Sequence, residues 1–365
     1  MRGESQREPA WTRAESEAMS AALEAARQGP RGANPLVGAA ILIDDRLIAV
    51  GHHRGAGTPH AEVDAIETAR RAGADLSRAE LLVTLEPCGH TGRTPPCAQA
   101  VIDAGIPRVI HAIDDPNPTA AGGAAALRAA GVEVRSGLLA EEAAVLNARW
   151  LECARAHRPF VTAKTAMTLD GRIAAADGTS QWITGPAARA SGHDLRARAD
   201  AILVGTGTLA ADNPRLTARV GAAPDPADDS PSSVAPASPH QPLRCVMGLR
   251  PVPPDAALRA DDHWLHLPTR DPREALAALA ALAEHGAGHV LIEGGATVLT
   301  AFLAADLVDE LVVHIAPLLL GSGRGAIGDL GITTLAEARR FRPDSPPALL
   351  GDDLVIRYAA SPRAH

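Results

Sequence analysis

Three side chains in the first half of the chain have the chemistry of transition-metal ligands. His60 lies in the stretch GTPHAEV, Cys88 in LEPCGH and Cys97 in TPPCAQ. One imidazole and two thiolates are the protein ligands of a catalytic zinc site, which leaves the fourth tetrahedral position for water. Glu62 stands just after His60, where a carboxylate can take a proton from that water and pass it to a leaving amine. The set predicts hydrolysis at a zinc ion.

Two of these ligands are expected at the beginnings of helices. Thr58-Pro59 precedes His60, and Thr94-Pro95-Pro96 precedes Cys97; a Thr N-cap followed by Pro at N1 is typical of a helix start. Partial positive charge at a helix N-terminus stabilises a thiolate, so we expect a lowered pKa for Cys97. A structural zinc site or two buried thiols are the alternatives. The order His-Ala-Glu, Glu-Pro-Cys and Pro-Cys favours the catalytic site.

The motif order is that of zinc nucleobase deaminases, which carry His-x-Glu and then Pro-Cys-x-x-Cys, but here eight residues separate Cys88 from Cys97. With this spacing, EPCGHTGRTPPC, preceded by NPLVG (34–38) and followed by DDPNP (114–118), resembles the deaminase half of the bifunctional riboflavin-biosynthesis deaminase–reductases. The resemblance covers about residues 12–150. It implies a cytidine-deaminase-like, three-layer α/β domain that hydrolyses the 2-amino group of 2,5-diamino-6-ribosylamino-4(3H)-pyrimidinone 5′-phosphate.

The same resemblance implies substrate contacts in this half. His90 and Arg93, in the long loop between the cysteines, would bind the 5′-phosphate, and Asn34, Asp115 and Asn117 would read the pyrimidine edge. From the residues alone, the alternatives are that the two asparagines are turn residues before proline and that the arginine is a solvated surface residue.

Two positions depart from the family's pattern. Asp64 stands where a histidine is common, and Gly89 stands where a serine is common. Neither belongs to the zinc set. Gly89 has no side chain, so it lacks any hydroxyl contact that a serine would make there.

A second group of motifs follows Pro159. AKTAMTLDGRIA, SQWITG, LRARADAILVGTGTLAADNPRLTAR and VLIEGGATVL occur in this order. The stretch VGTGTL lacks the third glycine of a dinucleotide fingerprint, so we do not expect a Rossmann domain. An apolar strand, two glycines and a helix in HVLIEGGATVLTAFL are typical of phosphate binding at a helix N-terminus, although the pattern alone fits an ordinary strand–helix turn equally well.

Together these motifs resemble the reductase half of the same family over about residues 158–360. The resemblance implies a dihydrofolate-reductase-like α/β fold, NADPH as cofactor, reduction at C1′ of the ribosylamine, and a homo-oligomer. It places NADPH against Ala166, Trp182, Thr208, Asp212, Gly295, Ala296, Thr297, Val298, Leu299, Thr300 and Ala301. It places the substrate against Ser180, Arg196, Leu216, Arg219 and Glu293, with the two arginines as partners of its phosphate. Trp182 could instead anchor the core.

Lys164 is the only lysine of the chain, although Lys and Arg together number 35. It lies in the middle of an apolar stretch, two residues before Ala166. An ammonium is compact and fits where a guanidinium does not. We predict that Lys164 binds the ribose of the substrate, with Asp212 nearby, and that the two act in catalysis. The alternative is a lysine codon that survived by chance in an arginine-rich chain.

Length and composition limit the function classes. A chain of 365 residues is expected to form two domains, and 46% hydrophobic and 21% charged residues are typical of a soluble protein. A net charge of −8 argues against nucleic acid as the main partner, and hence against a deaminase of bases in tRNA. No membrane span or signal peptide is expected. Four cysteines are too few for a disulfide scaffold, so we expect a cytoplasmic protein with Cys153 and Cys245 in its cores.

The expected organisation is two units of alternating strands and helices. In the first, we predict a helix over 11–28, a hairpin over 36–51 that turns at Asp44-Asp45, a helix that ends at Gly73, and a helix over 140–156. In the second, strands are predicted at FVTAKTAM, ADAILVG, LRCVMGL, HVLIEGG, ELVVHIAP and DLVIRY. The predicted boundaries are a flexible tail over 1–10, the deaminase domain over 11–150, and the reductase domain over 158–365 with a flexible insertion over 221–241.

The alternative from another class of function is a nucleotide-binding regulator with a structural zinc. Glu62 argues against it, because a structural zinc site needs no general acid or base.

Overall fold

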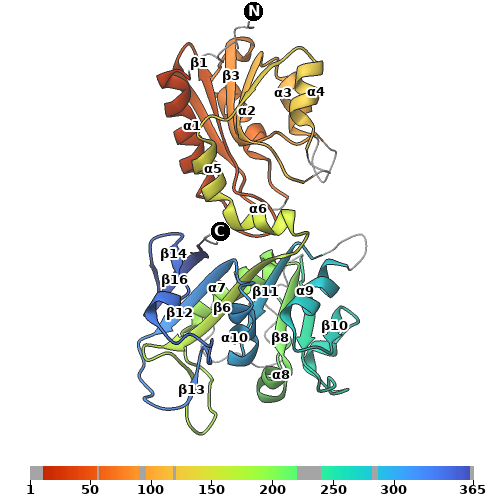
Figure 1. Cartoon of the computed structure of the whole chain (residues 1–365), viewed down its shortest axis with the longest axis vertical. Helices are drawn as coiled ribbons and strands as arrows, with labels where there is room; N and C mark the ends of the chain where they lie inside the picture. The colour runs from red at the N-terminus through yellow and green to blue at the C-terminus, as the bar shows by residue number, and fades with distance from the viewer. Residues whose placement is uncertain are drawn as a thin grey trace, which may run out of the picture. The chain divides into compact units, whose positions relative to one another are not determined.

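The computed structural model describes residues 11–55, 57–89, 96–117, 121–219, 240–281 and 287–361. The predicted tail and nearly all of the predicted insertion lie outside these residues. The chain forms two compact units that divide between Arg155 and Ala156, and each unit has its own sheet (Figure 1).

The first unit is built on a five-stranded sheet in the order β2-β1-β3-β4-β5. The strands are β1 (Gly38–Ile43), β2 (Arg46–His52), β3 (Ala79–Leu85), β4 (Arg108–Ile113) and β5 (Glu133–Ser136). The hairpin β1–β2 is antiparallel, β1 is antiparallel to β3, and β3, β4 and β5 are parallel. The helices are α1 (Arg13–Ala26), α2 (Ala61–Arg71), α3 (Cys97–Asp103), α4 (Gly123–Ala129), α5 (Ala140–Leu146) and α6 (Ala148–Arg155).

Alternating strand residues divide the first unit into the three predicted layers. Ile41 and Leu81 pack with α2, α3 and α4 on one face, whereas Leu42 and Leu82 pack with α1 and α5 on the other. Because consecutive strand residues point to opposite faces, an uninterrupted apolar strand such as β3 is the expected sequence for a sheet covered on both sides.

Local turn chemistry explains the confirmed predictions in this unit. Asp44 and Asp45 both have positive φ, of 48° and 58°, which is the conformation of the two-residue hairpin turns that match strand twist. Helix α2 has its C-cap at Ala72, and Gly73 follows with φ 74°, as a left-handed residue after a helix does.

Two helix predictions were wrong in detail, and one strand was missed. Helix α2 begins at Ala61 with His60 as N-cap, so Thr58-Pro59 lies outside the helix. The helix predicted over 140–156 is two helices, because the side chain of Asn147 interrupts it and pairs with the backbone N–H and C=O of Leu36 at 2.9 Å each. Strand β5 was not predicted, since its four residues have no apolar pattern.

The second unit contains a nine-stranded sheet in the order β10-β9-β8-β11-β6-β12-β16-β14, with β15 paired to β16. Its strands are β6 (Phe160–Thr168), β8 (Ala201–Gly205), β9 (Leu243–Met247), β10 (Trp264–Leu267), β11 (His289–Glu293), β12 (Glu310–Ala316), β14 (Phe341–Pro343), β15 (Ala348–Leu350) and β16 (Asp353–Ala360). All six predicted strands are present. The strands from β10 to β12 are parallel, and β16 is antiparallel to β12. A small separate sheet joins β7 (Arg172–Ala174) and β13 (Arg324–Gly325).

Helices cover both faces of this larger sheet. They are α7 (Pro186–Arg198), α8 (Thr206–Asp212), α9 (Pro272–Ala280) and α10 (Ala296–Ala304). Residues of α9 and α10 pack on one face and residues of α7 and α8 on the other. Strand β11 lies between β6 and β8, although β8, β9 and β10 come before it in the chain. Such a change in strand order leaves a crevice at the carboxyl ends of parallel strands, which is where ligands bind in open α/β sheets.

Candidate active sites

The first site brings together the three predicted metal ligands. His60 is the N-cap of α2, Cys97 is the first residue of α3, and Cys88 lies in the loop that follows β3. Their ligand atoms all lie within 4.8 Å of one another. Nδ1 of His60 is 3.1 Å from Sγ of Cys97 and 3.7 Å from Sγ of Cys88. One nitrogen and two sulfur donors at this separation fit a zinc ion with one coordination position left open.

The thiolate expected at the helix N-terminus is that of Cys88, whereas the prediction placed it on Cys97. The backbone N–H of Cys97, at the start of α3, donates a hydrogen bond to Sγ of Cys88 at 3.3 Å. Hydrogen bonds from Cys97 and His60 lower the pKa of Cys88 to about 4. The pKa of Cys97 is raised by its hydrogen bond to Cys88 and by burial, so the predicted lowering at Cys97 is contradicted. The first turn of α3 stabilises the thiolate in front of it, and two adjacent thiols do not ionise equally.

Glu62 lies in the first turn of α2, and its side chain is hydrogen-bonded to Cys97. Only 3% of the residue is exposed. Burial raises the pKa of this carboxyl group above its ordinary value. A carboxyl group with a raised pKa beside an open metal position can both accept and donate a proton near neutral pH.

Asn34 is connected to this site by His53, which was not among the predicted functional residues. Nδ2 of Asn34 is 3.3 Å from Nε2 of His53, whose Nδ1 is 3.3 Å from the carbonyl oxygen of Pro59. The carbonyl can only accept, so Nδ1 of His53 donates and Nε2 accepts from the Asn34 amide. The ring of His53 packs edge-on against His60, with centroids 5.2 Å apart. The His-His pair before Arg54 in GHHRGAG was the sequence signal available.

The departure at Asp64 has a structural explanation in this chain. Its carboxylate accepts two hydrogen bonds from the guanidinium of Arg54, both at 3.0 Å, and one from the backbone N–H of His52. These bonds tie the end of β2 to the first turn of α2. Asp64 therefore holds the segment that carries His53.

The departure at Gly89 follows from close backbone contact. A Cβ atom at Gly89 would lie 2.9 Å from the nitrogen of Gly123, and one at Gly123 would lie 1.8 Å from the carbonyl oxygen of Pro87. The loop that carries Cys88 and the start of α4 are thus packed backbone against backbone. A serine at position 89 would not fit without moving α4.

Glu86 fixes the loop that carries the predicted pyrimidine-reading residues. Its carboxylate accepts hydrogen bonds from the backbone N–H groups of Asp115 (3.3 Å), Gly122 (3.1 Å) and Ala124 (3.0 Å). Asp115 in turn accepts from the N–H of Asn117 at 2.8 Å. In the sequence, Glu86 is recognisable only as part of the Glu-Pro-Cys motif. The two predicted phosphate-binding residues, His90 and Arg93, lie outside the described residues.

We predict that Glu86→Ala raises KM for deamination more than it lowers kcat, with zinc content unchanged. Three backbone N–H groups lose their acceptor, which costs about 1–3 kcal/mol of unfolding free energy for each group that water cannot reach. Hydrogen exchange at the Gly122 and Ala124 amides should be faster in this variant. Glu133→Ala, at an exposed position of the same unit, is the control. Unchanged exchange at both amides would show that Glu86 does not hold the loop.

The second site is a cavity of about 650 Å³ in the second unit. It lies along the carboxyl ends of β8 and β11, against the loops before α7 and after α8. Most of the predicted reductase residues line it: Lys164, Ala166, Ser180, Trp182, Arg196, Thr208, Asp212, Leu216, Arg219, Glu293, Gly295, Ala296 and Leu299. Trp182 is 50% exposed, which removes the alternative of a core anchor.

Lys164 and Glu293 are register partners on the neighbouring strands β6 and β11. Burial lowers the pKa of Lys164, and the charge of Glu293 opposes this shift. Burial alone would raise the pKa of Glu293, but the charges of Arg196 and Lys164 hold it below the ordinary value. Gly192 of α7 faces both side chains, because a Cβ atom there would lie 3.8 Å from Nζ of Lys164 and 3.9 Å from Oε1 of Glu293. The cluster keeps a charged carboxylate beside the ammonium.

Arg196 already has hydrogen-bond acceptors within the protein. Its Nε donates to both carboxylate oxygens of Glu293 at 3.0 Å, and one terminal nitrogen donates to the carbonyl oxygen of Thr217 at 3.1 Å. Asp212 lines the same cavity, where partial desolvation of its carboxyl group raises its pKa and the charge of Arg324 opposes the shift.

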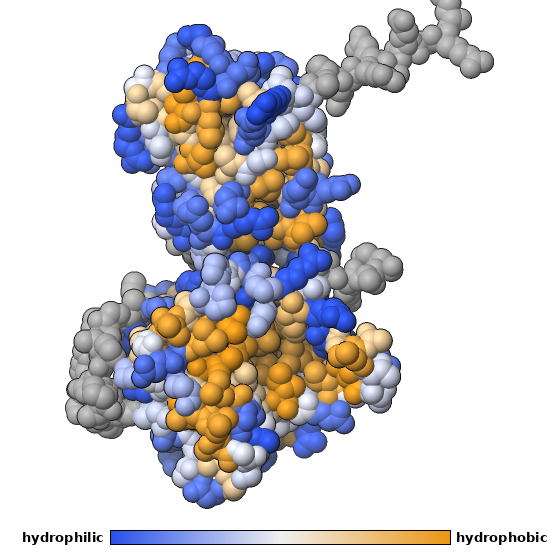
Figure 2. Space-filling model, turned by 90° about the vertical axis from the view of Figure 1, so that its left-hand side faces the viewer, coloured by the Kyte–Doolittle hydropathy of each residue, from blue (hydrophilic) through white to orange (hydrophobic). Residues whose placement is uncertain are grey.

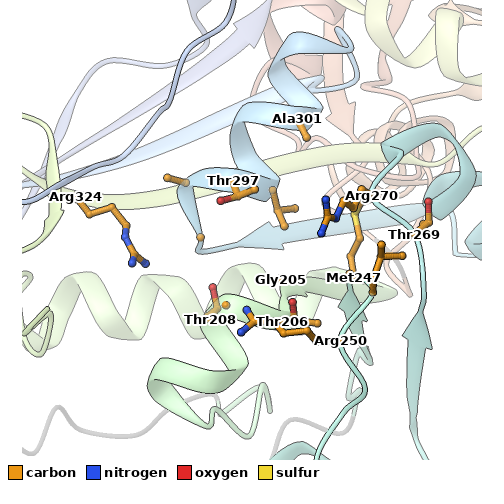
Figure 3. A pocket seen from close by; sticks show the side chains of 16 residues that line it. Gly205, Thr206, Thr208, Met247, Arg250, Thr269, Arg270, Thr297, Ala301 and Arg324 are labelled. Atoms are coloured by element: carbon orange, nitrogen blue, oxygen red, sulfur yellow. The ribbon is translucent and has the colours of Figure 1, made fainter.

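A second cavity of about 350 Å³ adjoins the first and shares Thr208, Gly295 and Ala296 with it (Figure 3). It contains the predicted residues Thr297, Val298 and Ala301. Thr300 lines neither cavity, and its hydroxyl accepts a hydrogen bond from the N–H of Gly328 at 2.7 Å. The lining also includes residues that the sequence analysis did not identify: Thr206, Met247, Arg250, Thr269, Arg270 and Arg324.

The backbone between the two cavities suits a dinucleotide. Gly294 and Gly295 have φ of 79° and 71°, and α10 begins at the next residue. A helix N-terminus presented by left-handed glycines offers backbone N–H groups to a phosphate. The residues present therefore fit NADPH, with the pyrophosphate at α10.

Over the described residues, no helix has the length and apolar character needed to cross a membrane.

Comparisons with known proteins give two family matches and full-length relatives. Residues 12–113 match the cytidine and deoxycytidylate deaminase zinc-binding region, and residues 159–346 match the RibD C-terminal domain. Riboflavin biosynthesis protein RibD of Mycobacterium tuberculosis is 44% identical over 349 residues, covering 94% of this chain and 97% of that protein. The RibD protein of Escherichia coli is 38% identical, covering 89% of this chain and 94% of that protein.

Solved structures agree with these matches. Acinetobacter baumannii RibD, form 1, aligns with a TM-score of 0.69 at 34% identity and covers 95% of this chain and 99% of that one. The Thermotoga maritima structure described as a diaminohydroxyphosphoribosylaminopyrimidine deaminase/5-amino-6-(5-phosphoribosylamino)uracil reductase aligns with a TM-score of 0.65 at 32% identity, again over 95% and 99% of the two chains.

Proposed function

The chain belongs to the bifunctional deaminase–reductase family of riboflavin biosynthesis, and from that premise we propose which of its residues carry the two reactions. Its activity is zinc-dependent hydrolytic deamination of 2,5-diamino-6-ribosylamino-4(3H)-pyrimidinone 5′-phosphate, followed by NADPH-dependent reduction of the ribosyl chain to 5-amino-6-ribitylamino-uracil 5′-phosphate. We assign the deaminase to residues 11–150 and the reductase to residues 158–365.

In the deaminase, His60, Cys88 and Cys97 hold the zinc ion, which when bound activates water for attack on the pyrimidine. Glu62 moves the proton from that water to the departing amino group. Asn34 binds the pyrimidine edge, oriented by its hydrogen bond to His53. The observation that carries this proposal is the convergence of one imidazole, two thiols and a buried carboxyl group from three separate elements. Asp115 and Asn117 are proposed as further substrate contacts, with His90 and Arg93 at the phosphate.

In the reductase, NADPH supplies the reducing equivalents when it is bound. Lys164 binds the ribose of the substrate and orients C1′, with Asp212 on the same cavity. Glu293 keeps the ammonium of Lys164 charged, and Arg196 holds Glu293 in place through three hydrogen bonds, two from its Nε and one from a terminal nitrogen. Arg219, Ser180 and Leu216 complete the substrate side. The bonds of Arg196 to Glu293 and Thr217 favour Arg219 as the main phosphate partner.

Incubation of the zinc-loaded protein with the diaminopyrimidine phosphate tests this function. Without NADPH, we expect ammonia release and accumulation of the deaminated product. With NADPH, we expect one cofactor oxidised for each ammonia released. Oxidation of NADPH without ammonia release would contradict the assigned order.

We further propose a cytoplasmic homo-oligomer with no nucleic-acid partner. Figure 2 shows apolar side chains gathered on one face of the second unit. A contiguous apolar surface is the kind that subunit contacts cover. Leu319, Leu335 and Leu349 of the same unit are 74%, 85% and 72% exposed. The zinc-type thiols require a reducing compartment, and the net charge of −8 disfavours a polyanion.

A further inference from the structure

The segment that carries Asn34 has no regular secondary structure of its own. It runs from the end of α1 at Ala26 to the start of β1 at Gly38. Asn34 is exposed, whereas Leu36, two residues later, is buried. An amide that reads a base edge must be held accurately, because a displacement of about 1 Å can lower a rate about 100-fold. The bond to His53 fixes the end of the Asn34 side chain, and the backbone on either side needs its own support.

The side chain of Asn147 supports the backbone two residues after Asn34. Its carboxamide oxygen accepts a hydrogen bond from the N–H of Leu36, and its nitrogen donates to the carbonyl oxygen of Leu36, both at 2.9 Å. Asn147 is 1% exposed, so water does not compete for either bond. An amide side chain offers both an acceptor and donors, and here it pairs with a peptide group as a neighbouring strand would. Leu36 is thereby fixed to the junction between α5 and α6.

Two further hydrogen bonds join the same junction to the residues before Asn34. Nε1 of Trp150, in α6, donates to the carbonyl oxygen of Ala33 at 3.0 Å. A terminal nitrogen of Arg31 donates to the carbonyl oxygen of Leu146, the last residue of α5, at 3.3 Å. Together with the Asn147 pair, these contacts span 111 to 117 positions of the chain. The backbone of Asn34 is therefore held on both sides by residues that are remote in the sequence.

The contact of Trp150 is not explained by the hydrophobic core. Among the described residues of the first unit, the apolar clusters on both faces of the sheet do not include Trp150, although Leu36 and Leu146 belong to one of them. An indole N–H can only donate, and a partly buried tryptophan usually has a partner for it. In this fold the partner is the peptide carbonyl directly before Asn34.

We propose that Asn147 and Trp150 are positioning residues of the deaminase, which hold residues 33–36 so that the Asn34 amide meets the pyrimidine edge. The proposal rests on the proposed function, because it assumes that Asn34 binds the substrate. Trp150 belongs to α6, which ends at Arg155, where the two units divide. The helix that leads out of the first unit thus also supports its substrate site. Because neither residue is a zinc ligand, its loss affects substrate binding and leaves the metal in place.

A double-mutant cycle on ammonia release by the full-length, zinc-loaded protein tests the proposal. Trp150→Phe keeps an aromatic ring but loses the indole N–H. KM for the diaminopyrimidine phosphate should rise roughly three- to tenfold, as for the loss of one hydrogen bond, with kcat within about twofold. Asn147→Ala removes two bonds and should raise KM about tenfold or more. In the Asn34→Ala background, Trp150→Phe should change KM by less than about twofold, because residues that act through one another are not additive.

The matched control is Trp11→Phe in the same unit, which should behave like the parent. Its indole N–H has no hydrogen-bond partner within the described part of the chain. Zinc content, and reduction of the deaminated intermediate supplied directly, should be the same in all variants. Trp150→Phe alone decides the test if Asn147→Ala does not fold.

Two outcomes would overturn the proposal: an unchanged KM in Trp150→Phe, or the same rise in KM with and without the Asn34 amide. The second would show that Trp150 supports the fold by a route that does not pass through Asn34. Deamination by Asn34→Ala at the rate and KM of the parent would instead contradict the proposed substrate contact of Asn34.

Discussion

Glu62→Gln is expected to abolish deamination while the protein keeps its zinc. The amide retains the shape of the side chain but cannot accept a proton from water and deliver it to the departing amine. General acid–base groups contribute roughly 10²–10⁴-fold to rate, so ammonia release should fall by that factor. Metal analysis of the purified variant should give the same zinc content as the parent, because His60, Cys88 and Cys97 are unchanged.

Two controls make this result specific. Glu67→Gln, on the same helix but exposed, should keep full deaminase activity. NADPH-dependent reduction of the deaminated intermediate, supplied directly, should be unaffected in Glu62→Gln. Near-normal ammonia release in the zinc-loaded variant would mean that another group moves the proton.

Lys164→Arg is expected to abolish reduction and leave deamination intact, although it preserves the positive charge. The side chain lies mid-strand against Glu293 and faces Gly192 across a short gap. A guanidinium is larger and planar, so it cannot occupy this place without moving α7 or turning away from the ribose. We expect a loss of roughly 10²-fold or more in kcat, as for misplaced positioning groups. Lys164→Met, which keeps the length but loses the charge, should be equally impaired.

The single lysine also permits a direct measurement of its charge. Selective isotopic labelling of lysine gives one side-chain signal from Lys164, and its titration should give a pKa below the ordinary value of 10.5. A lysine with a lowered pKa is charged at low pH and loses its proton as the pH rises through that value. Reduction should therefore decline at alkaline pH in step with this titration. An unshifted pKa, or unchanged reduction by Lys164→Arg, would contradict the assigned role.

The zinc site could be predicted from local sequence, because each of its parts is a short motif on a single helix or loop. His60 and Glu62 share the start of α2, and Cys88 and Cys97 flank one loop. The pKa of Cys97 could not be predicted in this way, because it depends on which sulfur the N–H of Cys97 contacts in three dimensions. The break at Asn147 likewise depends on Leu36, which is 111 positions away in the chain.

Residues that act through tertiary contacts were the ones missed. Glu86 had no visible role until the loop of Asp115 and the start of α4 were found on its carboxylate. Arg250 and Arg270 lie 20 positions apart in the sequence and line one cavity because they follow β9 and β10, which are parallel neighbours. Thr300 was assigned to NADPH as part of a run of residues, but a helix turns successive side chains to different sides, so one member of the run faces Gly328 instead.

The central claim is that two separate sites in one chain carry out consecutive reactions, and mixing the two inactive variants tests it most directly. Glu62→Gln should reduce but not deaminate, and Lys164→Arg should deaminate but not reduce. Neither alone should convert the diaminopyrimidine phosphate to the ribityl product in the presence of NADPH. An equimolar mixture should restore that conversion, because the deaminated intermediate formed by one variant is consumed by the other. Failure of the mixture, with each variant folded and active in its remaining step, would contradict the account.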